Sequence, residues 1–311
     1  MKTTFFSFAL VGLLQFASAG LIKRQSASQP ADVGYATLNG GGAGGPTVTV
    51  SSLTALQSAA SGDLATIILV SGKISGAAVV KVGSNKSIIG KSGAVLEGVG
   101  LRVSKKNNVI IRNLKISKVL ASTGDAIGID YAKNVWVDHV ELSSDMSHSK
   151  DYYDGLLDIT HGSDYVTVSN SYLHDHWKSS LVGHSDNNSG EDKGHLTVSY
   201  VNNYWKNLNS RAPSYRFGTG HILNNYFENV SDGVNIRQNA KLLIEGNVWS
   251  GGKKAIYTTD GGSATLRNNE YGGASVSVPS ASVSVPYQYT ALAVGSTKSH
   301  VQANAGAKLN F

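Results

Sequence analysis

The chain has 311 residues and no cysteine, and 41% of its residues are apolar while 15% are charged. That apolar content suffices for a large core and excludes intrinsic disorder, and the lack of cysteine excludes disulfide scaffolds, thiol catalysis and cysteine-ligated zinc. Lysine and arginine outnumber aspartate and glutamate by 27 to 21, and 35 residues are glycine. Few charges and many turn-forming residues favour β structure over exposed helices.

The first 24 residues resemble a secretory leader. An apolar run from Phe5 to Phe16 follows Lys2, and Ala17-Ser-Ala19 completes a small-residue cleavage pattern. We expect residues 1–19 to be a signal peptide and residues 20–24, which end in a Lys-Arg pair, to be a propeptide, so that the protein is secreted. The apolar run is too short to span a membrane, and we expect no membrane association.

The leader carries three of the positive charges and no acid, which leaves a net charge of +3 on residues 25–311. A modest positive charge on a secreted chain without a lysine-rich tract favours an anionic extracellular polymer as partner, and not nucleic acid. Three glycosylation acceptor patterns follow, beginning at Asn85, Asn187 and Asn229.

Further along, residues 30–48 are rich in glycine and are expected to pack as an ordered N-terminal segment. Thr54 to Ala60 is expected to be a short helix that covers the first coil of a repeat structure. Residues 272–287, with alternating serine and valine, are expected to form a C-terminal arm that lies on the folded domain.

From residue 109 onward one short pattern recurs: an alternating β-branched stretch, a turn-forming residue, and an apolar or aromatic residue three positions later. The turn-forming positions are separated by 26, 31, 32, 22, 22 and 22 residues, and they are 113, 139, 170, 202, 224, 246 and 268. Alternation predicts strands, and a fixed step in the twenties predicts stacked repeats. We therefore predict an all-β fold, a single-stranded right-handed parallel β-helix with inserted loops, in which residues 25–311 form one domain.

Two other folds have related signatures. A leucine-rich repeat has a similar period but needs Leu-x-x-Leu-x-Leu, and a β-sandwich needs no fixed long period. The asparagines at the turn-forming positions are expected to form a side-chain hydrogen-bond ladder at a tight bend. The three longer steps predict insertions between residues 113 and 202, of the kind that build a binding face.

Three segments carry charges that a solenoid does not need. The first contains Asp125, and the second contains Asp154 and Asp158, which on an extended strand would face the same side. Two carboxylates on one face are costly unless a cation lies between them, and oxygen ligands suit calcium; solvated loop acids are the alternative. The third segment runs from Arg211 to Gly218 and is preceded by Lys178.

Taken in order, these residues resemble the signature set of the family 1 polysaccharide lyases, the pectate lyases. The resemblance covers about residues 86–271 and rests on Trp136-Val-Asp138-His139, Asp154 with Asp158, Lys178, Arg211-x-Pro213-x-x-Arg216 and Val234-Asn-Ile-Arg237-Gln238. It implies a parallel β-helix enzyme that cleaves polygalacturonate. By the same resemblance, Ca²⁺ is bound by Asp125, Asp154 and Asp158, Arg211 is the catalytic base, and Lys178 and Arg216 bind substrate carboxylates.

The implied reaction is a β-elimination. The proton on C5 of a galacturonate is α to a carboxylate, so calcium and the cations of Lys178 and Arg216 would stabilise the charge that develops when it leaves. Arg211 would accept that proton, and the bond to O4 would then break to give a 4,5-unsaturated product. Because a guanidinium has a pKa above 12, activity is expected to rise into alkaline pH.

Departures from the family pattern keep alternatives open. Thr123 stands where some members have a further acid, so calcium affinity without polymer is expected to be weak. The alternatives are a pectin lyase acting on methyl-esterified polymer without calcium, a polygalacturonase-type hydrolase using paired acids, and a non-catalytic wall-binding β-helix. Asp138 and His139 lie within a repeat and are expected to be structural. We expect a monomer.

Overall fold

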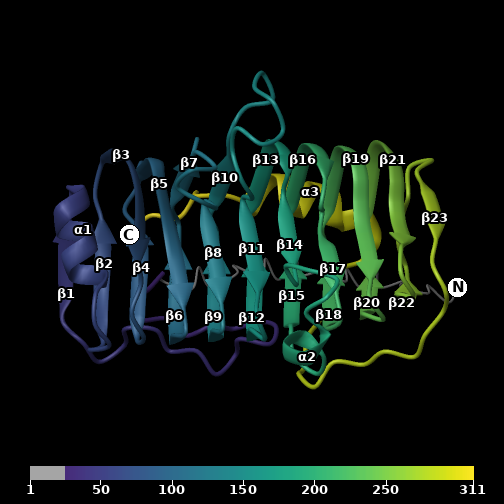
Figure 1. The fold of residues 1–311 in the computed structure, drawn as a ribbon, viewed down its shortest axis with the longest axis horizontal. Coiled ribbons are helices and arrows are strands. Elements are labelled where there is room, and N and C mark those ends of the chain that lie inside the picture. Colours follow the sequence, from purple (N-terminus) through teal and green to yellow (C-terminus); the bar gives the residue numbers. More distant parts are fainter. Residues whose placement is uncertain (1–24) are drawn as a thin grey trace, which may run out of the picture.

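The computed structural model describes residues 25–311, so the predicted signal peptide and propeptide lie outside the described residues. Every strand pair within its two sheets is parallel, and neighbouring strands come from successive coils (Figure 1). The fold is therefore the predicted parallel β-helix. The first sheet contains, in order, β1 (Thr47–Val50), β2 (Thr66–Val70), β4 (Lys86–Gly90), β6 (Asn107–Arg112), β9 (Lys133–Asp138), β12 (Asp164–Ser169), β15 (Thr197–Val201), β18 (Thr219–Leu223), β20 (Lys241–Glu245) and β22 (Ser263–Arg267).

The second sheet is bent, because its long strands pair with different short strands along their two halves. β5 pairs with both β7 and β8, and β19 pairs with both β16 and β17. We call the half that holds β8, β11, β14 and β17, with the C-terminal halves of β3, β5 and β19, the site face. The strands of this sheet are β3 (Lys73–Lys81), β5 (Val95–Ser104), β7 (Lys115–Ser117), β8 (Ile127–Asp130), β10 (Glu141–Ser143), β11 (Leu157–Thr160), β13 (Tyr172–Lys178), β14 (Ser180–Val182), β16 (Tyr204–Ser210), β17 (Ser214–Arg216), β19 (Tyr226–Arg237), β21 (Val248–Thr258) and β23 (Ser275–Ser277).

The core is a stack of inward side chains in matching register. Val109 pairs with Val135, Val135 with Val166, and Val166 with Val198, and all four are fully buried. From Val198 onward the partner lies 22 residues further along at every step, through Gly220 to Leu242 and Ala264 in the last coils. Each coil covers the open end of its neighbour, which is why the fold depends on stacking.

The recurring turn-forming residues occupy the left-handed region of backbone conformation, which asparagine tolerates better than most side chains. They lie where the chain leaves a strand of the first sheet. Their φ angles are 54° at Asn113, 49° at His139, 46° at Asn170, 56° at Asn202, 50° at Asn224, 65° at Gly246 and 48° at Asn268.

The predicted ladder exists, but the prediction of its residues was wrong by one position. Asn203 donates to Asn225, Asn225 to Asn247, and Asn247 to Asn269, each through a 3.0 Å bond from Nδ2 to Oδ1. The first three of these side chains are fully buried. Two neighbouring residues therefore have separate roles. The first makes the bend, and the asparagine after it satisfies buried polar groups between coils.

Two helices pack against strands of the solenoid and cover apolar side chains there. α1 (Leu53–Ala60) begins after Ser52, whose Oγ accepts a hydrogen bond from the Ala55 amide at 3.3 Å, and it buries Leu56 against the first coils. The predicted capping helix is therefore confirmed (Figure 1). α3 (Val294–Asn304), which the sequence did not predict, packs against β19 and β21. No helix among residues 25–311 has both the length and the hydropathy that a membrane span requires.

The N-terminal segment and the later part of the C-terminal arm lie on the first sheet. The prediction that residues 272–287 form only an arm was wrong in part, because Ser275–Ser277 form β23, which pairs with β21 in the second sheet. Residues 30–48 cross the first sheet from late to early coils: the Tyr35 amide donates to Ser199 in β15, and the Gly42 amide donates to Ser87 in β4. As predicted, this segment is ordered by packing.

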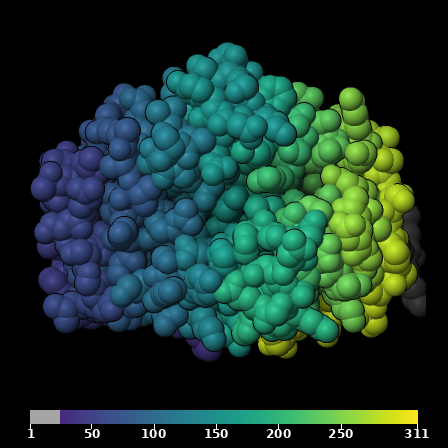
Figure 2. Space-filling model, viewed as in Figure 1, coloured from purple at the N-terminus to yellow at the C-terminus, as the bar shows by residue number. Residues whose placement is uncertain are grey.

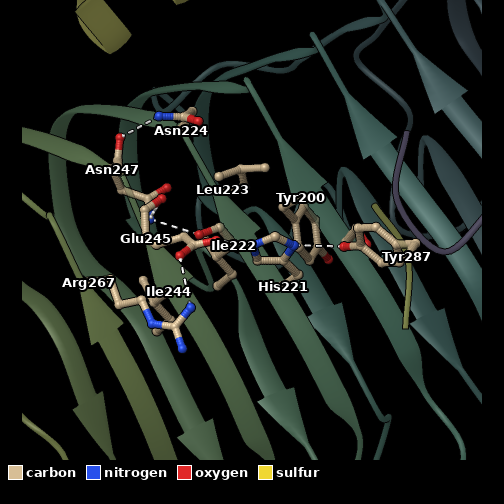
Figure 3. Close-up of polar contacts among 12 residues, drawn as sticks. Tyr200, His221, Ile222, Leu223, Asn224, Ile244, Glu245, Asn247, Arg267 and Tyr287 are labelled. Atoms are coloured by element: carbon tan, nitrogen blue, oxygen red, sulfur yellow. Dashed lines mark hydrogen bonds and ion pairs between the residues drawn. The ribbon is translucent and has the colours of Figure 1, made fainter. Parts of the chain in front are cut away.

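The C-terminal arm is attached to the same sheet through a buried histidine (Figure 3). Tyr287 Oη lies 2.7 Å from Nδ1 of His221 and 2.8 Å from Oγ of Ser199. On its other side, His221 Nε2 lies 3.1 Å from Oε1 of Glu245. Because His221 is completely buried, the arm supplies a polar partner that solvent would otherwise have to provide.

Asp138 and His139 have structural surroundings. The buried Asp138 carboxylate accepts bonds of 2.7 Å from Arg112 Nε and from Ser169 Oγ, and His139 Nδ1 lies 2.7 Å away. Burial acts to raise the pKa of Asp138, but the His139 hydrogen bond and the Arg112 charge outweigh it and the pKa is lowered.

Replacing Asp138 with asparagine should destabilise the protein by about 3–5 kcal/mol at pH 7, because Arg112 is left buried without its counter-ion. A carboxyl with a lowered folded pKa stabilises above its ordinary pKa near 4, and that contribution is lost as the pH falls through the folded value. Urea unfolding from pH 7 to pH 2 should therefore show a shallower loss of stability in Asp138→Asn than in the natural protein. Equal slopes would contradict this role.

Candidate active site

Two insertions border the site face. Residues 144–156 connect β10 to β11 and project from the solenoid, and residues 183–196 connect β14 to β15 and contain α2 (Ser189–Asp192) (Figure 1). Figure 2 shows the surface hollowed along the middle between these two projections. Both insertions fall within the predicted range of residues 113–202.

Asp125 and Asp158 approach each other across Gly155. The Gly155 amide donates to Oδ1 of Asp125 at 3.0 Å, and the Leu181 amide donates to Oδ1 of Asp158 at 3.1 Å. A Cβ atom at Gly155 would lie 2.4 Å from Asp158 Oδ1 and 2.9 Å from Asp125 Oδ1. Only glycine therefore leaves the space between the two carboxylates open.

The negative charge of this pair is only partly compensated by the cations beside it. Burial, with repulsion from Asp154, raises the pKa of Asp125 to about 6. Burial and repulsion from Asp125 raise the pKa of Asp158 well above its ordinary value. The guanidinium of Arg211 opposes both shifts but does not reverse them. At neutral pH the two carboxylates repel each other, and solvent screens this repulsion little because both groups are partly shielded from water.

Arg211 lies between β16 and β17 in a left-handed conformation with a φ of 60°. Its carbonyl accepts a 2.7 Å bond from the Ser180 amide, which fixes the backbone to the neighbouring coil. Its side chain makes no hydrogen bond or ion pair with any of residues 25–311, although its charge acts on Asp125 and Asp158. The guanidinium is thus available to a substrate.

Asp154 is paired with Lys178, while its charge also acts on Asp125 and Asp158. Lys178 Nζ lies 3.3 Å from Oδ1 of Asp154 and 3.0 Å from Oδ1 of Asp151. Asp154 precedes β11, and only Asp158 belongs to that strand, so the interpretation that both acids project from one strand was wrong. We call the segment with Asp151 and Asp154 the acidic loop; its two carboxylates and the ammonium group of Lys178 compensate each other's charge.

His176 supports this loop and was not singled out in the sequence. It lies 2.5 Å from the Asp154 carbonyl through Nε2, and 2.5 Å from Oγ of Ser144 through Nδ1. Burial lowers the pKa of His176 to about 4, so the ring is neutral and Nε2 donates to the carbonyl while Nδ1 accepts from the hydroxyl. In the sequence His176 is only one residue of an alternating strand.

The Arg216 side chain is bound to an acid that takes no part in the contacts of Lys178. Its Nε donates to Oδ1 of Asp186 at 2.5 Å, its Nη1 donates to the Gly183 carbonyl at 2.8 Å, and its exposed fraction is 8%. Arg237 donates to the other oxygen of Asp186 at 2.7 Å. The structure therefore brings Asp125, Asp158 and Arg211 together, places Asp154 with Lys178 beside them, and pairs Arg216 with an acid that the sequence did not indicate.

The donor set fits a divalent cation only in part. Among residues 25–311, no three acidic or histidine side chains are grouped closely enough to hold a metal ion as they stand. Asp125 and Asp158, however, are shielded carboxylates with raised pKa values, and Gly155 keeps the space between them open. Hard oxygen donors of this kind suit calcium, and Asp154 would have to leave Lys178 before it could join them.

Fold and site together define the class: a parallel β-helix protein whose face combines half-buried carboxylates with lysine and arginine side chains. A family model described as pectate lyase matches residues 10–310, and the chain therefore belongs to the pectate lyase family and is a polysaccharide lyase.

Named relatives agree with this assignment. Pectate lyase A of Aspergillus niger is 57% identical over 295 residues, which cover 93% of this chain and 91% of that protein. Pectate lyase A of Emericella nidulans is 56% identical over 302 residues, or 95% and 92%. The pectate lyase of Bacillus sp. N165, solved in complex with trigalacturonate, superposes with a TM-score of 0.79 and 30% identity over 89% of this chain and 98% of that one.

Proposed function

We propose that the protein is a secreted, calcium-dependent pectate lyase that cleaves α-1,4-polygalacturonate by β-elimination and releases 4,5-unsaturated oligogalacturonates. The observation that carries this proposal is the half-buried pair of Asp125 and Asp158, beside the guanidinium of Arg211, which makes no hydrogen bond or ion pair with any of residues 25–311. The leader pattern of residues 1–24 supports secretion. The trigalacturonate bound to the Bacillus relative supports a polymer of galacturonate as substrate.

Each side chain has a role that its surroundings allow. Calcium at Asp125, Asp158 and Asp154 would supply the positive charge that stabilises the carboxylate next to the reacting carbon. Lys178, released from the acidic loop, would bind a substrate carboxylate. The neutral form of Arg211, whose side chain has no hydrogen-bond or ion-pair partner among residues 25–311, would accept the C5 proton before the bond to O4 breaks.

An assay with two substrates tests the proposal. The protein is incubated with polygalacturonate or with highly methylated pectin, each with calcium or with a chelator, and ultraviolet absorbance of the unsaturated product is followed. We expect absorbance on polygalacturonate with calcium only. Absorbance on methylated pectin with chelator would identify a pectin lyase, reducing ends without absorbance a hydrolase, and neither signal a wall-binding protein.

A further inference from the structure

Outward-facing residues of the site face form a row across neighbouring strands. Lys81 of β3 pairs in register with Arg102 of β5, Arg102 with Gly128 of β8, and Gly128 with Asp158 of β11. Neighbouring strands are about 4.8 Å apart, so Lys81 lies three strands, or about 14 Å, from the acid pair. The row continues the site toward the N-terminal coils.

Arg102 connects the acid pair to that end of the row. Its guanidinium lies flat over Gly128, where a Cβ atom would come within 2.7 Å of Cζ. Nη2 lies 3.6 Å from Oδ2 of Asp125, and Nη1 donates to Oδ2 of Asp130 at 3.1 Å. Glycine at position 128 therefore allows a cation to lie along the sheet surface between two acids.

Beyond Arg102 the surface opens into a pocket of about 530 Å³. Three cations and one acid line it, namely Lys81, Arg102, Lys106 and Asp130. Lys106 is bound to Asp63 at 2.9 Å outside the pocket, and Asp130 is bound to Arg102. Lys81 is exposed, and no ion pair joins it to another of residues 25–311.

We propose that Lys81 and Arg102 form a further subsite, which binds the carboxylate of a uronate unit of the polymer several strands away from the bond that is cleaved. The pocket has a surplus of positive charge, it shares a face with Arg211, and its row of residues leads directly to Asp158. A chain that carries one carboxylate on every unit can engage both ends of that row at once. This inference rests on the proposed function.

Two substrates of different length test the subsite. The efficiency kcat/KM is measured on trigalacturonate and on octagalacturonate for the natural protein, for Lys81→Ala and for Lys241→Ala. Lys241 is an exposed lysine of β20 in the other sheet, so this control removes the same charge elsewhere. We expect the octamer-to-trimer ratio of kcat/KM to fall roughly two- to fivefold in Lys81→Ala, the range of a partly exposed ion pair, and to stay unchanged in Lys241→Ala.

Direct binding separates this inference from the proposed function. Octagalacturonate titrated calorimetrically should bind Lys81→Ala with a Kd roughly two- to fivefold weaker than that of the natural protein, and the difference should shrink in 0.5 M salt. Equal Kd values and equal length ratios would overturn the subsite even if the natural protein cleaves the polymer. Weaker binding by Lys81→Ala would support it even if no unsaturated product forms, an outcome that would overturn only the proposed reaction.

Discussion

Arg211→Ala should lower kcat on polygalacturonate by roughly 10²- to 10⁴-fold, the usual contribution of a positioned acid or base. The side chain makes no hydrogen bond or ion pair with any of residues 25–311, so its removal leaves no partner without a bond. With calcium present to compensate Asp125 and Asp158, on which the Arg211 charge acts, the unfolding temperature should stay nearly unchanged. Polymer affinity should also remain, because Lys178 and calcium would still bind carboxylates. Stopped assays of the unsaturated product and a binding isotherm measure the two quantities separately.

A matched control removes a different arginine. Arg267→Ala takes away a half-exposed guanidinium of β22, on the first sheet, and kcat should stay within twofold of the natural value. If Arg211→Ala retains a tenth or more of the natural kcat, Arg211 is not the base. The natural protein's rate should rise into alkaline pH, because a guanidinium holds its proton tightly; an optimum near pH 5 would also exclude the assignment.

The repeat could be predicted because bends and core positions recur locally in the sequence. Asparagine pairs at 202–203, 224–225 and 268–269 marked three of the seven bends, but a pair of identical residues does not show which member bends the chain and which joins the ladder. The φ angle of 50° at Asn224 and the bonds of Asn225 settle this. The early coils at β1, β2 and β4 were missed because Asn113 is the first asparagine at a bend position of the first sheet. One coil earlier, the equivalent position is occupied by Gly90, so the asparagine pattern does not extend to these coils.

The site was predictable where its residues form a motif and not where they depend on strand pairing. Asp125, Asp158 and Arg211 lie in segments that no solenoid requires. Arg102 and His176, in contrast, lie in ordinary alternating strands. Arg102 reaches Asp125 only because β5 pairs with β8, and His176 reaches the Asp154 carbonyl only because a long insertion returns over β13. Such contacts join residues 22 or more positions apart, which a local pattern does not record.

Asp158→Asn should change stability in opposite directions with and without calcium. In the metal-free protein the substitution removes one of two repelling, shielded carboxylates, so the unfolding temperature at pH 8 should rise by roughly 2–4 °C for each kcal/mol of repulsion relieved. Calcium should raise the unfolding temperature of the natural protein but hardly that of the variant. Differential scanning calorimetry with added calcium or chelator measures both effects without any assay of activity.

The pH dependence follows from the same pair. Because the folded protein holds the Asp125 proton up to a pH of about 6 while the unfolded chain releases it near 4, the metal-free protein loses stability as the pH rises through that window. Asp158→Asn should flatten this loss, and calcium should stabilise the natural protein more at pH 8 than at pH 5, where protons compete for the carboxylates. Asp32→Asn, which removes an exposed acid of the N-terminal segment, should behave as the natural protein does. A calcium response that survives undiminished in Asp158→Asn would show that the ion binds elsewhere, since the substitution removes one of the two carboxylates that border the space beside Gly155.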